Sequence, residues 1–370
     1  MDFLRCRTAA YIDLGNAEHN YNVIKNSLNP GTKIFPVIKA DGYGHGAVPL
    51  AALYQKLGAE MFCVSCITEA IQLRNNSITL PILILGFTLP EYAPQLLEYD
   101  IIQAVHSDEY AHDLAHNIPD GKRMKIHIKL DTGMRRIGFT PDMHPERLFD
   151  DAKFEVCGLF THYAESDNLN SDFTGKQLEK YHKMLSRMEG KNILCHTANS
   201  AAALCHPNTH FDGVRPGIIL YGEYPSAQVK EQFEKSEKKL MQVMTFTSRI
   251  THIFDVKKGE SIGYSRTFFA PNDMKIATVC AGYADGVPRL LSNKGKIGIK
   301  GRLYNIVGNI CMDQFMIDIT GADNIKLYDE AVIFGKGGVS CEEVAEICGT
   351  ISYEIFCSIS KRVNRVYIGG

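Results

Sequence analysis

An alternation of short β-rich runs with amphipathic stretches, which fills the first two thirds of the chain, is the strongest constraint on its fold. Eight runs have the composition of buried strands: Ile34–Lys39, Phe62–Ser65, Ile82–Leu85, Ile101–Val105, Lys125–Asp131, Val156–His162, Ile193–Thr197 and Phe211–Arg215. Helix-like stretches accompany them: Asp13–Leu28, Val48–Leu57, Thr68–Arg74, Glu91–Glu98, Asp108–His116, Pro145–Ala152, Gly175–Met188 and Ser200–Cys205. Eight successive β/α units predict a closed (β/α)8 barrel of the TIM type, with a doubly wound open sheet as the alternative.

The pattern changes near residue 240, after the charged stretch Lys230–Lys239, which we interpret as a solvated helix face or connector. Extended runs without helices follow: Met241–Phe254, Lys275–Ala281, Lys296–Ile299, Cys311–Ile319 and Ala331–Phe334. They predict a mainly β C-terminal domain with a late helix at Cys341–Cys348 and a short one around Ser352–Ser360. We therefore expect a barrel domain over 10–235 and a β domain over 236–370, with residues 1–9 as a candidate addition to the second.

Charge and composition exclude several classes of function. The 370 residues include 40 Lys and Arg against 42 Asp and Glu, a net charge of −2, which offers no electrostatic footprint for nucleic acid or an anionic membrane. No apolar run approaches the roughly 18 residues of a spanning helix, and the first residues do not resemble a signal peptide. Eleven scattered cysteines, an odd number, suggest reduced thiols. We expect a cytoplasmic protein.

A glycine-rich segment follows the first predicted strand. Lys39 ends that strand, and Gly42, Gly44 and Gly46 follow in G-x-G-x-G spacing. The carboxyl ends of barrel strands form the usual active-site face, and a lysine there is suited to form a Schiff base with a carbonyl compound. A solvated lysine before a tight turn is the other interpretation of this segment.

The fifth predicted strand places polar side chains on one face. His127, Lys129 and Asp131 alternate with apolar residues, which should face the helices, so the polar set should point into the barrel. A buried Lys129 ammonium would need a counter-charge or a chemical change, because an unpaired buried charge is costly. A strand at a wet rim is the alternative.

The ends of the last two predicted strands carry groups that suit an anion. Ser200 follows the seventh strand and could cap the next helix, while Arg215 and Gly217 end the eighth. Loops after the last two barrel strands often bind phosphate, to which Arg215 would offer a permanent cation and Gly217 an open N–H. Simple capping by Ser200 is the alternative.

Two spacings typical of metal ligands are not interpreted as metal sites. Cys63 and Cys66 have a single CxxC spacing without a second pair, and they lie in or beside a strand. His112 and His116 lie four residues apart but lack the glutamate of the zinc-protease pattern, so a solvated helix face is expected. The sequence predicts no metal site.

Taken together, the motifs resemble the pyridoxal-phosphate-dependent alanine racemase family of the barrel type, nearly from end to end. The matching segments are Ile38–Gly46, Leu130–Met134, Arg136–Gly138, Thr161–Ala164, Thr197–Ser200, Val214–Gly217, Tyr221–Gly222, Gly263–Tyr264, Gly282–Gly286, Cys311–Gln314 and Ile351–Glu354. The first of these and Cys-Met-Asp-Gln are the most specific. One departure is Asn309, where many members carry arginine, which leaves the charge of the substrate access corridor open.

The resemblance implies a reaction and a set of site residues. The reaction is interconversion of L- and D-alanine, which supplies D-alanine for the bacterial cell wall, in a homodimer whose sites are shared between subunits. Lys39 would form the aldimine with pyridoxal 5'-phosphate and act as one base, with Tyr264 of the partner chain as the other. Further cofactor contacts would come from Tyr43, His162, His196, Asn199, Ser200, Arg215, Gly217, Ile218 and Tyr353. Substrate contacts would come from Arg136, Met312 and Asp313. Lys129 matches a lysine that is often carbamylated in the family.

Three rival functions share the architecture. A serine or broad-specificity racemase would use the same scaffold, and Tyr353 beside the phosphate favours the smaller alanine. Barrel decarboxylases are expected to place an acidic residue at the pyridine nitrogen, where this chain has Arg215. A non-catalytic pyridoxal-phosphate-binding barrel would resemble only the first domain, so the β domain with Tyr264 argues against it.

Overall fold

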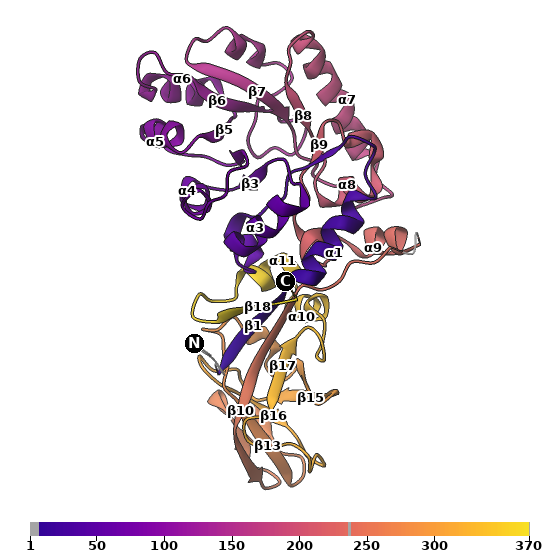
Figure 1. The fold of residues 1–370 in the computed structure, drawn as a ribbon. Coiled ribbons are helices and arrows are strands. Elements are labelled where there is room, and N and C mark those ends of the chain that lie inside the picture. The colour runs from indigo at the N-terminus through magenta and orange to yellow at the C-terminus, as the bar shows by residue number, and fades with distance from the viewer. Residues whose placement is uncertain (1–6, 236–237, 370) are drawn as a thin grey trace. The chain divides into compact units, whose positions relative to one another are not determined.

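The computed structural model describes residues 7–235 and 238–369, which form two compact units. The barrel unit contains Ala17–Gly42 and Gly46–Met241. The β unit contains the chain up to Asn16, the short segment Tyr43–His45, and the chain from Gln242 onward. Figure 1 shows the barrel unit in indigo to pink and most of the β unit in orange to yellow.

Eight parallel strands form the centre of the barrel unit, in the order β2-β9-β8-β7-β6-β5-β4-β3. They are β2 (Lys33–Ile34), β3 (Phe62–Val64), β4 (Ile82–Ile84), β5 (Ile101–Val105), β6 (Met124–Lys129), β7 (Phe154–Phe160), β8 (Leu194–His196) and β9 (Gly213–Val214). The chain beyond β2 closes the ring, because Val37 forms a parallel bridge with Cys63 and the Ile38 N–H donates to the Cys63 carbonyl. The predicted (β/α)8 barrel is therefore confirmed, and the open sheet is not found.

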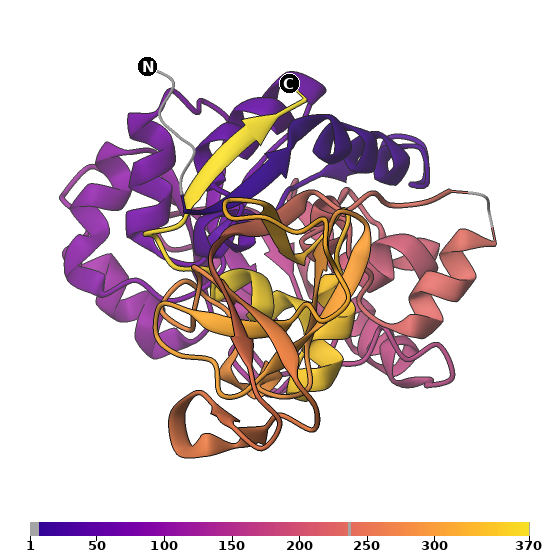
Figure 2. The same cartoon turned by 90° about the horizontal axis from the view of Figure 1, so that it is seen from below.

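Helices flank these strands on the outside, as Figures 1 and 2 show. They are α1 (Leu14–Lys25), α3 (Ala47–Leu57), α4 (Ile67–Asn75), α5 (Ala93–Glu98), α6 (Asp108–Asn117), α7 (Phe173–Leu185), α8 (Ser200–Cys205) and α9 (Ala227–Glu234). The helix expected over Pro145–Ala152 is instead a short 3-10 turn, η2 (Pro145–Phe149). Of the charged stretch Lys230–Lys239, residues 236–237 lie outside the described residues. None of the helices in the described ranges has the length and apolar character that crossing a bilayer requires.

The β unit is built on an eight-stranded sheet in the order β13-β16-β15-β14-β17-β10-β1-β18, with β13 also pairing β10. The strands are β1 (Thr8–Asp13), β10 (Met244–Val256), β13 (Met274–Val279), β14 (Lys296–Ile299), β15 (Arg302–Val307), β16 (Phe315–Asp318), β17 (Glu330–Phe334) and β18 (Asn364–Ile368). A small hairpin, β11 (Ser261–Ile262) with β12 (Phe268–Phe269), and helices α10 (Cys341–Cys348) and α11 (Ser352–Cys357) complete the unit.

Strand β1 shows how distant segments combine in this sheet. It pairs antiparallel with β10 and parallel with β18, and Figure 2 shows β18 in yellow beside β1 in indigo. The start of the chain thus contributes a strand to the C-terminal sheet, although residues 1–6 lie outside the described residues. Strands β1, β15 and β18 have no counterpart among the runs that the sequence pattern indicated.

Candidate active site

Lys39 opens a left-handed turn rather than ending a strand. Strand β2 ends at Ile34, and the segment labelled α2 (Lys39–Tyr43) has φ/ψ values of 52°/49° at Ala40, 53°/47° at Asp41 and 61°/44° at Gly42. Tyr43 also has a positive φ of 52°. The strand predicted up to Lys39 is therefore wrong at its end, because a left-handed backbone cannot continue a sheet. For a residue with a Cβ this conformation costs about 1–2 kcal/mol, so the surroundings must stabilise the turn.

Arg215 forms the centre of a buried hydrogen-bond network directly after β9. Its Nη1 donates to His196 Nδ1 at 2.7 Å and to the His196 carbonyl at 2.6 Å. Its Nη2 donates to the carbonyls of Thr161 at 2.6 Å and Thr197 at 2.9 Å. These four bonds use both Nη groups, and among the described residues no hydrogen bond engages the Nε–H. The guanidinium is 3% exposed, so Arg215 is held rigidly by the ends of neighbouring strands.

The direction of these bonds fixes the protonation of two histidines. An arginine only donates, so His196 Nδ1 is an acceptor and a neutral His196 carries its proton on Nε2. His196 Nε2 lies 2.8 Å from His127 Nδ1, which must then accept. Burial lowers the pKa of His127 to about 3, and burial with the nearby Arg215 charge holds the pKa of His196 well below its ordinary value. Both rings are therefore neutral at physiological pH.

Lys129 points into the barrel from β6, as the alternating pattern predicted. It is 3% exposed, its Nζ donates to the Leu130 carbonyl at 2.8 Å, and the same Nζ lies 5.3 Å from the centre of the Phe160 ring. Burial, with Arg215 as the next cause, lowers the pKa of Lys129 to about 7. No carboxylate among the described residues forms a salt bridge with this amine, so a large part of it is neutral at physiological pH.

Ser200 and Gly217 meet near the ends of β8 and β9. The Gly217 N–H donates to Ser200 Oγ at 2.9 Å, so the prediction of an open N–H at Gly217 is wrong: the neighbouring hydroxyl already accepts from it. Both Ser200 and Ile218 are buried. The prediction that Ser200 caps the helix is wrong: Asn199 is the N-cap of α8, its Oδ1 accepts from the Ala202 N–H at 3.0 Å, and Ser200 is the first helical residue. The extended backbone of Asn199 explains this, because a cap must lie outside the helical conformation.

Two residues that the sequence pattern did not single out support this cluster. The Phe160 ring stacks on the His196 ring, with centroids 4.9 Å apart and planes 8° apart. The Arg215 guanidinium carbon lies 5.3 Å from the centre of the same Phe160 ring. Gln177 of α7 is fully buried; its Nε2 donates to the His162 carbonyl at 3.0 Å and its Oε1 accepts from the Ala164 N–H at 2.9 Å. Gln177 lies on the apolar face of an amphipathic helix, and a polar residue at such a position is the sequence signal that could have identified it.

His162 is half-buried, and its ring is influenced by the same cations. Burial is the main cause that holds its pKa well below its ordinary value, and Arg215, Lys129, Arg136 and Lys39 contribute in that order. These four positive groups all lie in the barrel unit, and Lys129 and Arg136 belong to one segment, strand β6 and the loop that follows it. The barrel unit therefore combines a concentration of positive charge with neutral imidazoles and aromatic surface.

The remaining candidates belong to the β unit. The rings of Tyr43 and Tyr353 lie with centroids 5.8 Å apart. Tyr264 and Met312 are 72% and 52% exposed. Asp313 forms a salt bridge with Arg362 at 2.8 Å, so its carboxylate already has a cationic partner.

Asn309, the departure from the family pattern, contacts the Tyr264 segment. Its Nδ2 donates to the Tyr264 carbonyl at 2.8 Å from a buried position. Gly263, Ser265 and Arg266 have positive φ values of 76°, 62° and 50°, so Tyr264 lies in a constrained loop. Asn309 therefore acts on the backbone of Tyr264, and its neutral amide adds no charge there.

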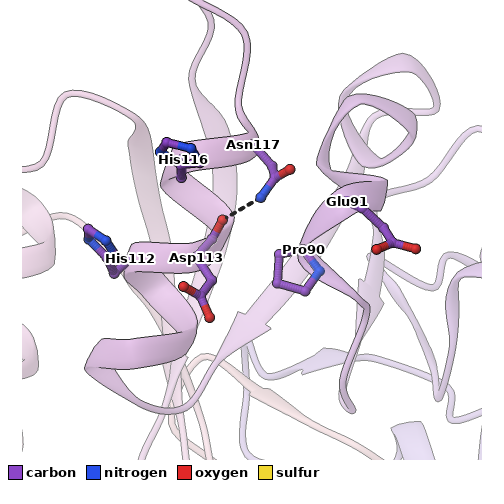
Figure 3. A pocket seen from close by; sticks show the side chains of 6 residues that line it. All are labelled: Pro90, Glu91, His112, Asp113, His116 and Asn117. Carbon is purple, nitrogen blue, oxygen red and sulfur yellow. Dashed lines mark hydrogen bonds between the residues drawn. The ribbon is translucent and has the colours of Figure 1, made fainter.

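His112 and His116 line a surface pocket of about 420 Å³ together with Pro90, Glu91, Asp113 and Asn117 (Figure 3). Both histidines are exposed on α6, as the expected solvated face requires. Among residues 7–235 and 238–369, no group of three or more His, Cys, Asp or Glu side chains is arranged to hold a metal ion. The described cysteines, Cys63 and Cys66 included, are free thiols.

Comparisons with known proteins agree along the whole chain. The family model described as alanine racemase, N-terminal domain, matches residues 12–225, and the one described as alanine racemase, C-terminal domain, matches residues 243–367. A curated alanine racemase from Desulforamulus reducens is 41% identical, over 97% of this chain and 98% of its own length. One from Methanococcus maripaludis is 39% identical over 97% and 98%.

Solved structures give the same result. The alanine racemase of Clostridium difficile 630 superposes with a TM-score of 0.92 at 39% identity, covering 99% of this chain and 96% of that one. The alanine racemase of Bacillus anthracis superposes with a TM-score of 0.93 at 33% identity, covering 100% and 97%. The fold and the buried cationic cluster define a barrel enzyme with an appended β domain. The chain belongs to the alanine racemase family.

Proposed function

We propose that this protein interconverts L-alanine and D-alanine with pyridoxal 5'-phosphate as its cofactor. The observation that carries the proposal is the Arg215–His196–His127 hydrogen-bond chain at the end of the barrel strands, in a chain of this family. A permanent cation at Arg215, held by four hydrogen bonds, would then face the pyridine nitrogen of the cofactor.

The chemistry of the donor set fits that cofactor. Pyridoxal phosphate carries a dianionic phosphate, an aldehyde and a pyridine nitrogen that accepts a hydrogen bond. Arg215 has an Nε–H not used by the described residues, and Lys39 has a primary amine. The Ser200 hydroxyl, which accepts from the Gly217 N–H, keeps one O–H that can donate. The neutral rings of His162 and His196 add no charge that would oppose the ring of the cofactor.

Each group would then have a defined part. Ser200, Gly217, Ile218, Tyr43 and Tyr353 would hold the phosphate, with Asn199 fixing the start of α8. His162 would pack on the cofactor ring, and His196 would orient Arg215. When bound, the cofactor supplies delocalisation for the negative charge that develops at the substrate Cα. Arg215 keeps its proton while donating a hydrogen bond, which keeps that delocalisation weak and favours return of a proton to Cα.

Racemisation requires a proton to leave one face of Cα and another to arrive on the opposite face. Lys39 Nζ and the Tyr264 hydroxyl are the two groups that we assign to these faces, because two opposed bases avoid any turning of the substrate between steps. Arg136, the Met312 backbone and Asp313 would bind the substrate, with Arg136 and the Met312 backbone at its carboxylate. The Asp313–Arg362 salt bridge would orient the segment that contains Met312.

Lys129 would become a carbamate. A neutral amine adds to carbon dioxide and releases a proton, which produces an anion, and a pKa of about 7 leaves much of Lys129 neutral. The anion would neutralise part of the surrounding positive charge and pair with Arg136. This change would also remove the cost of burying the charged form of Lys129.

We further propose a cytoplasmic homodimer whose two sites each combine the barrel domain of one chain with Tyr264 and Met312 of the other. The match of Tyr264 and Met312 to the family motifs supports it, and both side chains are exposed and therefore accessible to a partner. The barrel domain over 10–235 and the β domain over 236–370 would be the two functional parts. The product would supply D-alanine for the bacterial cell wall.

Conversion of L-alanine to D-alanine by the purified holoenzyme, followed by chiral chromatography, tests this function, with L-serine as the competing substrate. Rapid formation of D-alanine and slower formation of D-serine are expected. Faster turnover of serine would favour the broad-specificity racemase. Cofactor binding without turnover of either amino acid would favour the non-catalytic barrel.

A further inference from the structure

We propose that Glu69 is a positioning residue for Lys39, acting through the left-handed turn that Lys39 opens. The inference rests on the proposed function only in taking Lys39 as the residue that bonds the cofactor. Glu69 lies outside the motifs that carry the family resemblance. It is the third residue of α4, and its side chain is half-buried.

The carboxylate of Glu69 joins two separate backbone segments. Its Oε1 accepts from the Ala40 N–H at 2.6 Å, and its Oε2 accepts from the Ser65 N–H at 2.8 Å. Ala40 is the residue after Lys39, and Ser65 is the residue after β3. Both bonds are charge-assisted, which makes them stronger than bonds between neutral groups. Glu69 thus ties the peptide that follows Lys39 to the end of the neighbouring barrel strand.

The turn needs such a tie because its left-handed backbone conformation is unfavourable for residues with side chains. Ala40, Asp41 and Tyr43 carry side chains yet adopt φ values of 52°, 53° and 52°. Inside the turn the Gly42 N–H donates to the Ile38 carbonyl, and Asp41 Oδ1 accepts from the Ala47 N–H at 2.8 Å. These bonds secure the middle and the end of the turn. Glu69 secures its beginning, next to Lys39.

Loss of the Glu69 hydrogen bonds would leave the orientation of Lys39 less restricted. The peptide between Lys39 and Ala40 could rotate toward the ordinary regions of φ and ψ, and the Lys39 Cα would lose its fixed direction relative to β3. A nucleophile held in a near-attack position reacts faster than a mobile one. Glu69 should therefore affect the formation and strength of the covalent bond to the cofactor without touching the cofactor itself.

The experiment compares wild-type protein with Glu69→Gln, Glu69→Ala and the control Gln72→Ala, which removes an exposed side chain from the same helix. Apoprotein is titrated with pyridoxal phosphate, and the covalent bond to Lys39 is followed by its visible absorbance and by borohydride trapping with peptide mapping. We expect the cofactor Kd of Glu69→Ala to rise about tenfold, equivalent to about 1.4 kcal/mol. Glu69→Gln, which keeps one acceptor, should fall between this variant and wild type, and Gln72→Ala should match wild type.

Amide hydrogen exchange of the apoprotein provides a second measurement that does not involve the cofactor. The Ala40 and Ser65 amides should exchange faster in Glu69→Gln than in wild type, while amides in β5 keep their protection. If Glu69→Ala does not fold, Glu69→Gln alone tests the proposed role of Glu69. A lower melting temperature with unchanged Ala40 exchange and unchanged cofactor Kd would mean that Glu69 only supports α4, and would overturn the inference. If wild-type protein itself does not trap the cofactor on Lys39, the proposed function fails instead.

Discussion

Arg215 Nη1 donates to His196 Nδ1 across 2.7 Å, and His196 Nε2 lies 2.8 Å from His127 Nδ1 in turn. Because an arginine never accepts, this relay has one direction, and it keeps both imidazoles neutral while the positive charge stays on Arg215. The same arginine also satisfies three backbone carbonyls at the ends of β7 and β8. We therefore expect Arg215 to contribute both to stability and to the proposed cofactor site.

Replacing Arg215 by lysine should destabilise the protein strongly. A lysine cannot reach all four acceptors, so buried carbonyls would lose their donors, at a cost of about 3 kcal/mol in the free energy of unfolding. Denaturant unfolding measures this. The control is Arg187→Lys: Arg187 also bonds two backbone carbonyls, of Met143 and Pro141, but is exposed, and should lose less than about 1 kcal/mol. Equal losses of unfolding free energy in the two variants would show that burial of the Arg215 network does not increase its contribution to stability.

Gly158 should not tolerate a side chain. A Cβ at this position would lie 2.4 Å from atoms of the His127 ring, whereas a Cβ at Gly175 of α7 meets nothing within 4 Å. Gly158→Ala should therefore lower stability by about 1–3 kcal/mol and reduce racemisation by displacing His127 from His196. Gly175→Ala should be neutral or raise stability by about 0.5–1 kcal/mol. Thermal melts of the two variants beside wild type test this, and an undisturbed Gly158→Ala would contradict the packing described here.

The lowered pKa of Lys129 should make the stability of the protein rise with pH. Its pKa in the folded protein is about 7 against an ordinary value of 10.5, so the unfolded chain binds more protons between these values. Stability relative to Lys129→Met should then rise with pH, by about 3 kcal/mol from pH 7 to pH 10. Paired denaturation curves in buffers free of carbon dioxide measure the difference. Added bicarbonate at pH 7.5 should stabilise wild type and leave Lys129→Met unchanged; an equal response of both proteins would argue against a carbamate.

Two inactive variants should restore activity to each other if the sites are shared. Lys39→Ala and Tyr264→Phe homodimers are mixed and allowed to exchange subunits. In each mixed dimer one site has both wild-type bases and the other has neither, so about a quarter of all sites should be intact after random exchange. Absence of recovered activity, with exchange confirmed by mass spectrometry, would place both bases in one chain.

Patterns along the chain predicted the elements whose ends depend on local sequence. The bounds of β5 and α10 agree with the predicted Ile101–Val105 and Cys341–Cys348, because β5 is a fully buried run in which only Gln103 is polar, and a Ser340 capping box begins α10. Strands β1 and β18 were missed because their stability comes from pairing across more than 350 residues of chain, which leaves no periodic signal.

Within the site, residue types were predictable but backbone conformation was not. The inward direction of Lys129 follows from alternation along β6, which a sequence displays. The left-handed turn after Lys39 contains Ala40 and Asp41 at positions where glycine would be expected, so its conformation is imposed by tertiary contacts such as that of Glu69. The cap at Asn199 in place of Ser200 depends on a single residue's φ and ψ, which adjacent polar residues do not distinguish.

The most direct test of the central claim, that Lys39 and Tyr264 act on opposite faces of Cα, is α-proton exchange by Tyr264→Phe in deuterium oxide. Proton NMR with L-alanine and D-alanine in turn measures exchange, and chiral chromatography measures racemisation. We expect racemisation to fall by several orders of magnitude while deuterium still enters the one enantiomer whose α-proton faces Lys39, and cofactor content to be unchanged. Deuterium entering both enantiomers at wild-type rates, together with normal racemisation, would contradict it.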